Sequence, residues 1–112
     1  MVATTVELDR AITDFIRLLE RDIRVETIVL YGSYLHGEPH EWSDFDLAVI
    51  SPDFENMAMW QRQEMIATAT VYRDRRVSPM GYPSSEYHNP GPHSFLGEII
   101  RTGRVVYQAP VD

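Results

Sequence analysis

The stretch from Leu30 to Ile50, LYGSYLHGEPHEWSDFDLAVI, decides the fold of this chain. An apolar run ends at Gly32-Ser33, and a short segment then leads to a second glycine, Gly37. This pattern predicts a strand, a tight turn, and one or two helical turns closed by a left-handed glycine. Free backbone N–H groups at such a turn and helix start suit a phosphate group, and Ser33 adds a hydroxyl donor.

The second half of the stretch predicts another strand, from Ser43 to Ile50. Because side chains alternate between the two faces of a strand, Asp44 and Asp46 are expected on one face. Phe45 and Leu47 are expected on the other face. Two neighbouring carboxylates repel each other unless a cation lies between them, and Mg²⁺ is the usual cation. Asp44 and Asp46 are therefore the candidate metal ligands and catalytic residues.

The spacing of these residues matches a known motif. Gly32-Ser33, then ten residues, then Asp44-x-Asp46 form the motif GSx10DxD. Through it the stretch resembles the minimal nucleotidyltransferases of the DNA polymerase beta superfamily. The resemblance implies an α/β fold like the polymerase beta palm, with a mixed sheet of about four strands and helices mainly on one face. It also implies that Gly32 and Ser33 bind ATP phosphates, while Asp44 and Asp46 bind one or two Mg²⁺ ions.

The same resemblance implies a reaction and a partner. AMP would move from ATP to an acceptor hydroxyl, and pyrophosphate would leave. Stand-alone domains of this kind are similar to the antitoxin halves of toxin–antitoxin pairs, whose partner is a helical HEPN ribonuclease that the antitoxin can modify with AMP. We therefore expect an adenylyltransferase with a HEPN-type protein partner. The oligomeric state, including a homo-oligomer, is left open.

One position departs from the family pattern. A third strand is predicted from Val77 to Tyr82, and the family has a third carboxylate where Ser78 stands in this chain. The acidic residues nearby in the sequence are Asp74, Glu86 and Glu98, and none has the expected register. A degenerate protein that acts by nucleotide binding or protein contact is therefore an alternative. A small-molecule transferase of the aminoglycoside-modifying kind is a further one.

Composition limits the classes of function. The chain of 112 residues predicts one domain, 1–112, and it contains no cysteine. Its net charge is -7, and its 10 basic residues are all arginine. An acidic surface argues against a broad grip on nucleic acid, and the lack of lysine excludes a lysine nucleophile. The sequence has no apolar run of membrane-spanning length and no signal-peptide pattern at its start, so the cytoplasm is the expected compartment.

Apolar residues at helical spacing predict two long helices, Thr4 to Arg24 and about Phe54 to Arg75. The other predicted elements are the strands Val25 to Tyr31 and Arg104 to Tyr107, a loop from Tyr82 to His93, and a helix from Ser94 to Thr102 closed by Gly103. Pro79 and Gly81 favour an edge position for the third strand.

The second long helix has a predicted core face and two large apolar residues off that face. The predicted core face of the second long helix consists of Ala58, Met65, Ala69 and Tyr72, and Met59 and Ile66 flank it. Met57 and Trp60 lie off that face, where they either pack against a loop or form a partner surface.

The histidines near the motif give weaker signals. His36 stands where the family commonly has arginine, so it is either a phosphate contact or a solvated loop histidine. His36 and His40 have the spacing of a helical zinc pair, but Gly37 and Pro39 between them argue against one.

Overall fold

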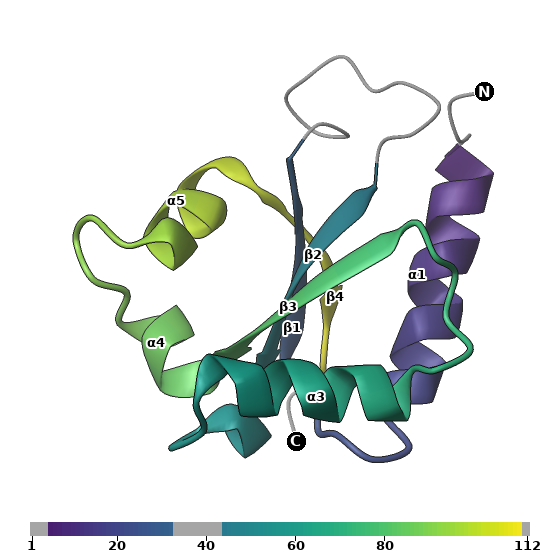
Figure 1. Cartoon of the computed structure of the whole chain (residues 1–112). Helices are drawn as coiled ribbons and strands as arrows, with labels where there is room; N and C mark the ends of the chain where they lie inside the picture. Colours follow the sequence, from purple (N-terminus) through teal and green to yellow (C-terminus); the bar gives the residue numbers. More distant parts are fainter. Residues whose placement is uncertain (1–4, 33–43, 111–112) are drawn as a thin grey trace.

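The computed structural model of the chain describes residues 5–32 and 44–110 (Figure 1). The strands of this part are β1 (Thr27–Tyr31), β2 (Phe45–Ser51), β3 (Val77–Pro83) and β4 (Arg104–Gln108). The helices are α1 (Thr5–Leu19), the short 3-10 helix η1 (Pro52–Phe54), α3 (Met59–Ala69), α4 (Ser84–His88) and α5 (Phe95–Thr102).

The strands form a single mixed sheet in the order β3-β2-β1-β4. β1 is antiparallel to both β2 and β4, whereas β2 and β3 are parallel. The predicted α/β architecture with a mixed four-stranded sheet is confirmed. β3 lies at an edge, as its proline and glycine predicted.

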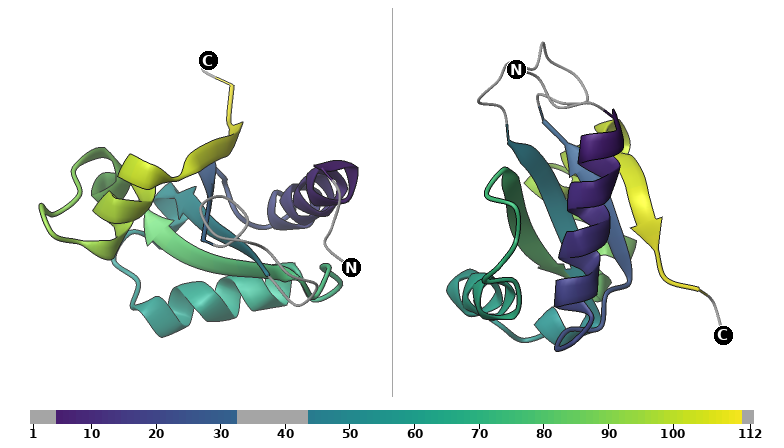
Figure 2. Two further views of the ribbon diagram at one scale, coloured as in Figure 1. Left: turned by 90° about the horizontal axis from the view of Figure 1, so that it is seen from above. Right: turned by 90° about the vertical axis from the view of Figure 1, so that its right-hand side faces the viewer.

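Strands β1, β2 and β3 send side chains into two separate cores. The larger core lies between the sheet and helices α1 and α3, and the smaller one lies between the sheet and α5. Figures 1 and 2 show that the two long helices cover one face while the short α4 and α5 cover the other. The strand residues of the larger core are Ile28, Leu30, Phe45, Leu47, Val49 and Val77. Those of the smaller core are Val29, Ala48, Ile50 and Tyr82.

Helix α1 follows its predicted apolar spacing but ends earlier than predicted. Its buried residues are Leu8, Ala11, Ile12, Phe15 and Leu19. Beyond Leu19 the chain turns, because the N–H of Arg24 donates to Asp53 (2.8 Å) and the N–H of Glu26 donates to the Ile50 carbonyl (2.8 Å). These contacts draw the chain into the sheet, so the predicted helix to Arg24 is too long.

The second predicted helix, Phe54 to Arg75, is also too long. Asn56 has a φ of 62°, a left-handed conformation that separates η1 from α3. At the other end the hydroxyl of Thr70 donates to the Ile66 carbonyl at 2.6 Å, and the helix stops at Ala69. Ile66 is buried, but Tyr72 lies past the helix end and is 87% exposed, so the predicted core position of Tyr72 is wrong.

Some of the other residues predicted on or near the core face of this helix pack against the core, and others are exposed to solvent. Met65 and Ala69 pack against the larger core, whereas Ala58 is exposed, so the predicted core position of Ala58 is wrong. Met59, predicted to flank the core face, is 39% exposed. Met57, predicted off the face, is partly buried against the core, and Trp60 is exposed.

The segment before the last helix was predicted as loop from Tyr82 to His93, but it contains α4. The last helix itself is confirmed. The Ser94 hydroxyl accepts from the N–H of Gly97 at 3.0 Å, and Gly103 ends the helix. In the part of the chain that the structure describes, none of the helices combines the length and apolar character needed to cross a bilayer.

Candidate functional site

The turn after β1 lies directly against a carboxylate of β2. Tyr31, the last residue of β1, pairs with Asp46 in the antiparallel register. The next residue, Gly32, has a φ of +86°, which side-chain-bearing residues rarely adopt. A Cβ atom built on Gly32 would lie 2.2 Å from the Asp46 Oδ2 atom. The turn therefore requires glycine for two independent reasons.

Asp44 and Asp46 bring two negative charges to one place. Asp44 is exposed just before β2, and Asp46 is partly buried within it. Burial raises the pKa of Asp46, and the neighbouring Asp44 carboxylate raises it further. The structure therefore brings the two predicted carboxylates close enough to repel.

A divalent cation would relieve this repulsion. Two carboxylates form an oxygen donor set suited to Mg²⁺, which usually keeps several positions for water and phosphate oxygens. Within residues 5–32 and 44–110 there is no cluster of three or more histidine or acidic side chains able to enclose a metal. The described residues thus fit an open metal site at Asp44 and Asp46.

Ser78 occupies the neighbouring position on β3. In the parallel register Asp46 pairs with Ser78, so these two side chains project from the same face of adjacent strands. Ser78 is partly buried and carries a neutral hydroxyl. Next to Asp46, β3 therefore provides a hydrogen-bonding group without a negative charge.

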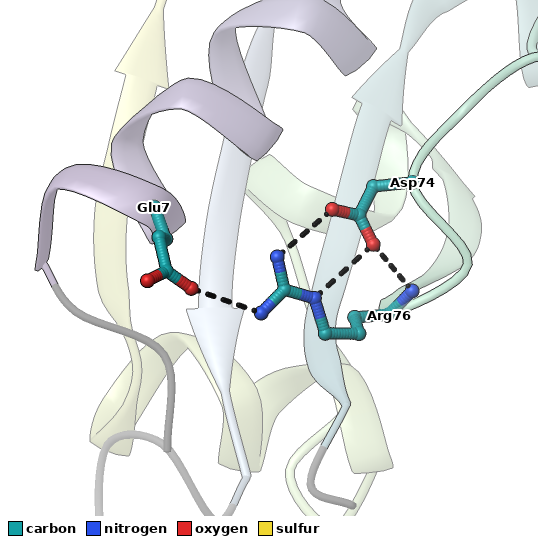
Figure 3. A network of polar contacts seen from close by, with 3 residues as sticks. All are labelled: Glu7, Asp74 and Arg76. Carbon is teal, nitrogen blue, oxygen red and sulfur yellow. Dashed lines mark hydrogen bonds and ion pairs between the residues drawn. The ribbon is translucent and has the colours of Figure 1, made fainter. Parts of the chain in front are cut away.

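Asp74, the nearest acidic residue before β3, is already engaged elsewhere (Figure 3). Its carboxylate accepts from the Arg76 side chain at 3.0 and 3.2 Å and from the Arg76 backbone N–H at 2.8 Å. The hydrogen bond from the Arg76 side chain is the main cause that lowers the pKa of Asp74. Arg76 also donates to Glu7 of α1 at 3.3 Å.

The position of Arg76 shows which face of the sheet this network occupies. The guanidinium carbon lies 5.1 Å from the centre of the Phe45 ring, and Phe45 belongs to the larger core beneath α1. Since Asp46 points to the opposite face from Phe45, the network holds Asp74 away from Asp46. Glu98 is paired with Arg101, and Glu86 lies exposed on α4. The structure gives none of the three acids the place of the missing carboxylate.

The aromatic side chain of Tyr31 lies next to Asp46 and contacts the ring of Phe95. Burial, the charge of Asp46 and the nearby Tyr82 raise the pKa of Tyr31 to about 12, so its hydroxyl stays protonated. The rings of Tyr31 and Phe95 meet edge to face with centroids 5.8 Å apart. Phe95 is 58% exposed. The sequence patterns did not indicate a role in the site for either residue. For Tyr31 the available signal is its position directly before Gly32 of the motif.

Several predicted residues lie outside the described part of the chain. They are the phosphate-binding candidate Ser33, the loop residues His36, Gly37 and His40, and the strand start Ser43. The described site therefore comprises Gly32, Asp44 and Asp46, with Tyr31 and Ser78 beside them.

Known proteins similar to this chain indicate its family. The family model for polymerase beta nucleotidyltransferases matches residues 14–110. The protein adenylyltransferase MntA of Shewanella oneidensis is 39% identical over 56 residues, which are 48% of this chain and 40% of MntA. The match thus spans less than half of that relative.

Two solved structures have a similar shape. One is a Sulfolobus solfataricus protein assigned as a nucleotidyltransferase, with a TM-score of 0.70 and 12% identity over 92% of this chain and 82% of that one. At this identity the likeness shows the fold alone. The other is a toxin–antitoxin structure with AMP-PNP, with a TM-score of 0.50 and 26% identity over 87% of this chain and 73% of that one.

Proposed function

Because the chain belongs to the polymerase beta nucleotidyltransferase family, we propose that it transfers AMP from ATP to a hydroxyl group of a partner protein. The observation that carries the proposal is the contact between the Gly32 turn and the Asp46 carboxylate, with Asp44 alongside. In this proposal the Gly32 turn binds phosphate, and the carboxylates of Asp44 and Asp46 beside it bind metal. The similarity to a protein adenylyltransferase supports AMP as the transferred group and a protein as the acceptor.

Each residue has a defined task in the proposed reaction. The backbone of Gly32 and the hydroxyl of Ser33 bind the β and γ phosphates. Asp44 and Asp46 would hold one or two Mg²⁺ ions. When bound, Mg²⁺ neutralises phosphate charge and favours departure of pyrophosphate.

The bond changes are those of an in-line displacement. The acceptor oxygen forms a bond to the α phosphorus, and the bond from that phosphorus to the β-phosphate oxygen breaks. Pyrophosphate takes the electron pair of the broken bond. Ser78 is not a base at neutral pH, so the hydroxyl proton passes to water or to a basic group of the partner.

We propose that the acceptor belongs to a helical HEPN-type protein and that this chain is the antitoxin of such a pair. The similarity to a toxin–antitoxin structure that contains AMP-PNP supports both a protein partner and an adenine nucleotide. The proposed partner would supply the surface around the acceptor hydroxyl.

Position-specific labelling tests the transfer. The chain is incubated with its co-purified partner, Mg²⁺ and ATP labelled at either the α or the γ phosphate. We expect the α label, and not the γ label, to move onto protein. Asp44→Asn/Asp46→Asn is expected to abolish this movement. Transfer of the γ label would indicate a kinase, and lack of any transfer would contradict the proposal.

A second candidate is a contact-only protein that has lost catalysis. The observation in its favour is Ser78 beside Asp46, combined with the engagement of Asp74 by Arg76. Calorimetry separates the two candidates. The enzyme is expected to bind ATP in the presence of Mg²⁺ and to lose binding in the double variant, whereas a contact-only protein binds its partner equally well in both forms.

A further inference from the structure

Four of the exposed apolar side chains in the described part of the chain lie on helix α3 or soon after its end. Among the described residues, the large apolar side chains with high exposure are Val6, Met59, Trp60, Val71, Tyr72, Phe95 and Val105. Two of them lie on α3, and Val71 and Tyr72 follow soon after its last residue. Trp60 is 67% exposed, which is unusual because tryptophan side chains are highly buried on average. Trp60 is therefore the starting point for an interaction surface, because it also lines a groove.

Trp60 borders a groove on the outer side of α3. The groove has a volume of about 600 Å³, and its lining residues are Asp22, Met57, Trp60, Gln61, Glu64, Met65, Thr68 and Ala69. All but Asp22 lie on α3 or just before it, and Asp22 follows the end of α1. Figure 2 shows these two helices adjacent on the same face of the sheet. Its apolar lining consists of Met57, Trp60, Met65 and Ala69. Methionine side chains adapt to an inserted apolar group.

The charged side chains that line the groove are both acidic. Asp22 and Glu64 are exposed, and neither carboxylate has a hydrogen bond or ion pair within the described ranges, 5–32 and 44–110. Arg62, the arginine of α3, is turned inward, because it donates to the carbonyls of Met57 (3.1 Å) and Gly81 (2.8 Å). The net charge of the chain is -7, which adds to the negative field.

We propose that this groove docks an amphipathic helix of the partner protein, whose apolar stripe is flanked by arginine or lysine side chains. An apolar floor with acidic borders is complementary to such a helix in both shape and charge. Trp60 is the central anchor, and Asp22 and Glu64 orient the helix. The inference deepens the proposed function, since it assigns the surface by which the acceptor protein is held. The groove lies on the opposite face of the sheet from Asp46 and contributes nothing to the chemistry.

Two synthetic helical peptides provide the test. Both carry the same leucine stripe, which is flanked by arginines in one peptide and by glutamates in the other. Binding is measured by the anisotropy of a dye on the peptide. We expect saturable binding of the arginine peptide and at least tenfold weaker binding of the glutamate peptide. Equal binding of both peptides would show non-specific adhesion and overturn the proposal, as would failure of the arginine peptide to bind.

Variants of the groove show where the peptide binds. Trp60→Ala and Glu64→Arg are each expected to weaken binding of the arginine peptide at least tenfold. Val105→Ala, which shortens an exposed apolar side chain on β4, is the matched control and is expected to leave binding unchanged. In a Trp42→Phe background Trp60 is the only tryptophan, so a blue shift of its emission on binding places the peptide in the groove. Undiminished binding by Trp60→Ala would overturn the assignment.

A second copy of the chain is the competing occupant. Sedimentation equilibrium of the unmodified chain and of Trp60→Glu distinguishes the two, because a dimer that the variant abolishes would overturn the partner-helix proposal. Since the peptide assay contains no ATP, failure of docking is distinguishable from failure of AMP transfer. Conversely, Trp60→Ala is expected to bind ATP as the native chain does.

Discussion

Gly32 and Asp46 are in such close contact that the smallest side chain at position 32 would collide with the Asp46 carboxylate. A Cβ atom on residue 32 would lie 2.2 Å from Oδ2 of Asp46 and 3.1 Å from its carboxyl carbon. The φ of +86° at Gly32 adds a second restriction. The turn that we propose to bind the nucleotide and the carboxylate that we propose to bind the metal are thereby fixed relative to each other by the backbone.

Gly32→Ala should therefore affect both stability and function. Left-handed strain costs about 1–2 kcal/mol of unfolding free energy. Displacement of the Asp46 carboxylate by the methyl group should lower AMP transfer about 100-fold, because catalysis depends on placement to within about 1 Å. Urea unfolding and initial rates measure the two effects. Gly91→Ala is the control, since a Cβ there meets its nearest atom at an ordinary 3.7 Å. Equal behaviour of the two variants would contradict the argument.

Asp46→Asn should stabilise the metal-free protein while abolishing transfer. Burial and Asp44 raise the pKa of Asp46, so the ionised form is less favourable in the folded than in the unfolded chain. The variant should thus unfold at a higher temperature than the native chain at neutral pH. This advantage should disappear as the pH falls below the ordinary aspartate range. Mg²⁺ should raise the unfolding temperature of the native chain only, and an equal effect on both would argue against a metal at this site.

Arg76→Gln tests the network that anchors α1 to the start of β3. Arg76 contacts Asp74, Glu7 and the Phe45 ring, and its partly exposed ion pairs are each worth well below 1 kcal/mol. With the cation–π contact the total loss should be about 1–2 kcal/mol in urea unfolding at neutral pH. Arg75→Gln, at an exposed neighbouring position, should change stability little.

The pH dependence of the same network has the opposite sign to that of Asp46. Arg76 lowers the pKa of Asp74, so the ionised carboxylate stabilises the folded state above the ordinary aspartate pKa. That contribution is lost as the pH falls through the lowered pKa. The stability difference between the native chain and Asp74→Asn should therefore be present at neutral pH and vanish in acid. A difference that persists in acid would show that packing, not charge, is responsible.

The sequence was sufficient to predict the sheet because its strands carry strong local signals. The run before Gly32 and the alternation after Asp44 identify β1 and β2, and a motif at fixed spacing identifies the family. Helix ends were predicted less well. The N–H of Arg24 donates to Asp53, which is 29 positions away, and no local sequence pattern near Arg24 predicts that contact.

In the candidate site, too, sequence patterns indicated the residues that are neighbours in sequence but not the contacts between distant elements. Asp44 and Asp46 are close in sequence, so strand periodicity alone places them together. The proximity of Phe95 to Tyr31 depends on how α5 packs across the sheet, which periodicity does not specify. Asp74 and Arg76 are close in sequence, so their ion pair is a local contact. The face of the sheet on which this ion pair lies follows only from the contact of Arg76 with the Phe45 ring.

Ser78→Asp tests whether the missing carboxylate limits the reaction. The register of β2 and β3 places this side chain next to Asp46, so a third carboxylate would share the proposed metal site. If removal of the acceptor proton is limiting, transfer should rise at least about tenfold, since general bases contribute about 100-fold or more. Without Mg²⁺ the variant should be less stable than the native chain, because a third like charge is added. Ser78→Asn has similar size without charge and should show neither effect. A rate for Ser78→Asp no higher than that of Ser78→Asn would show that the proton is already removed by another group, and the search for the base would move to the partner.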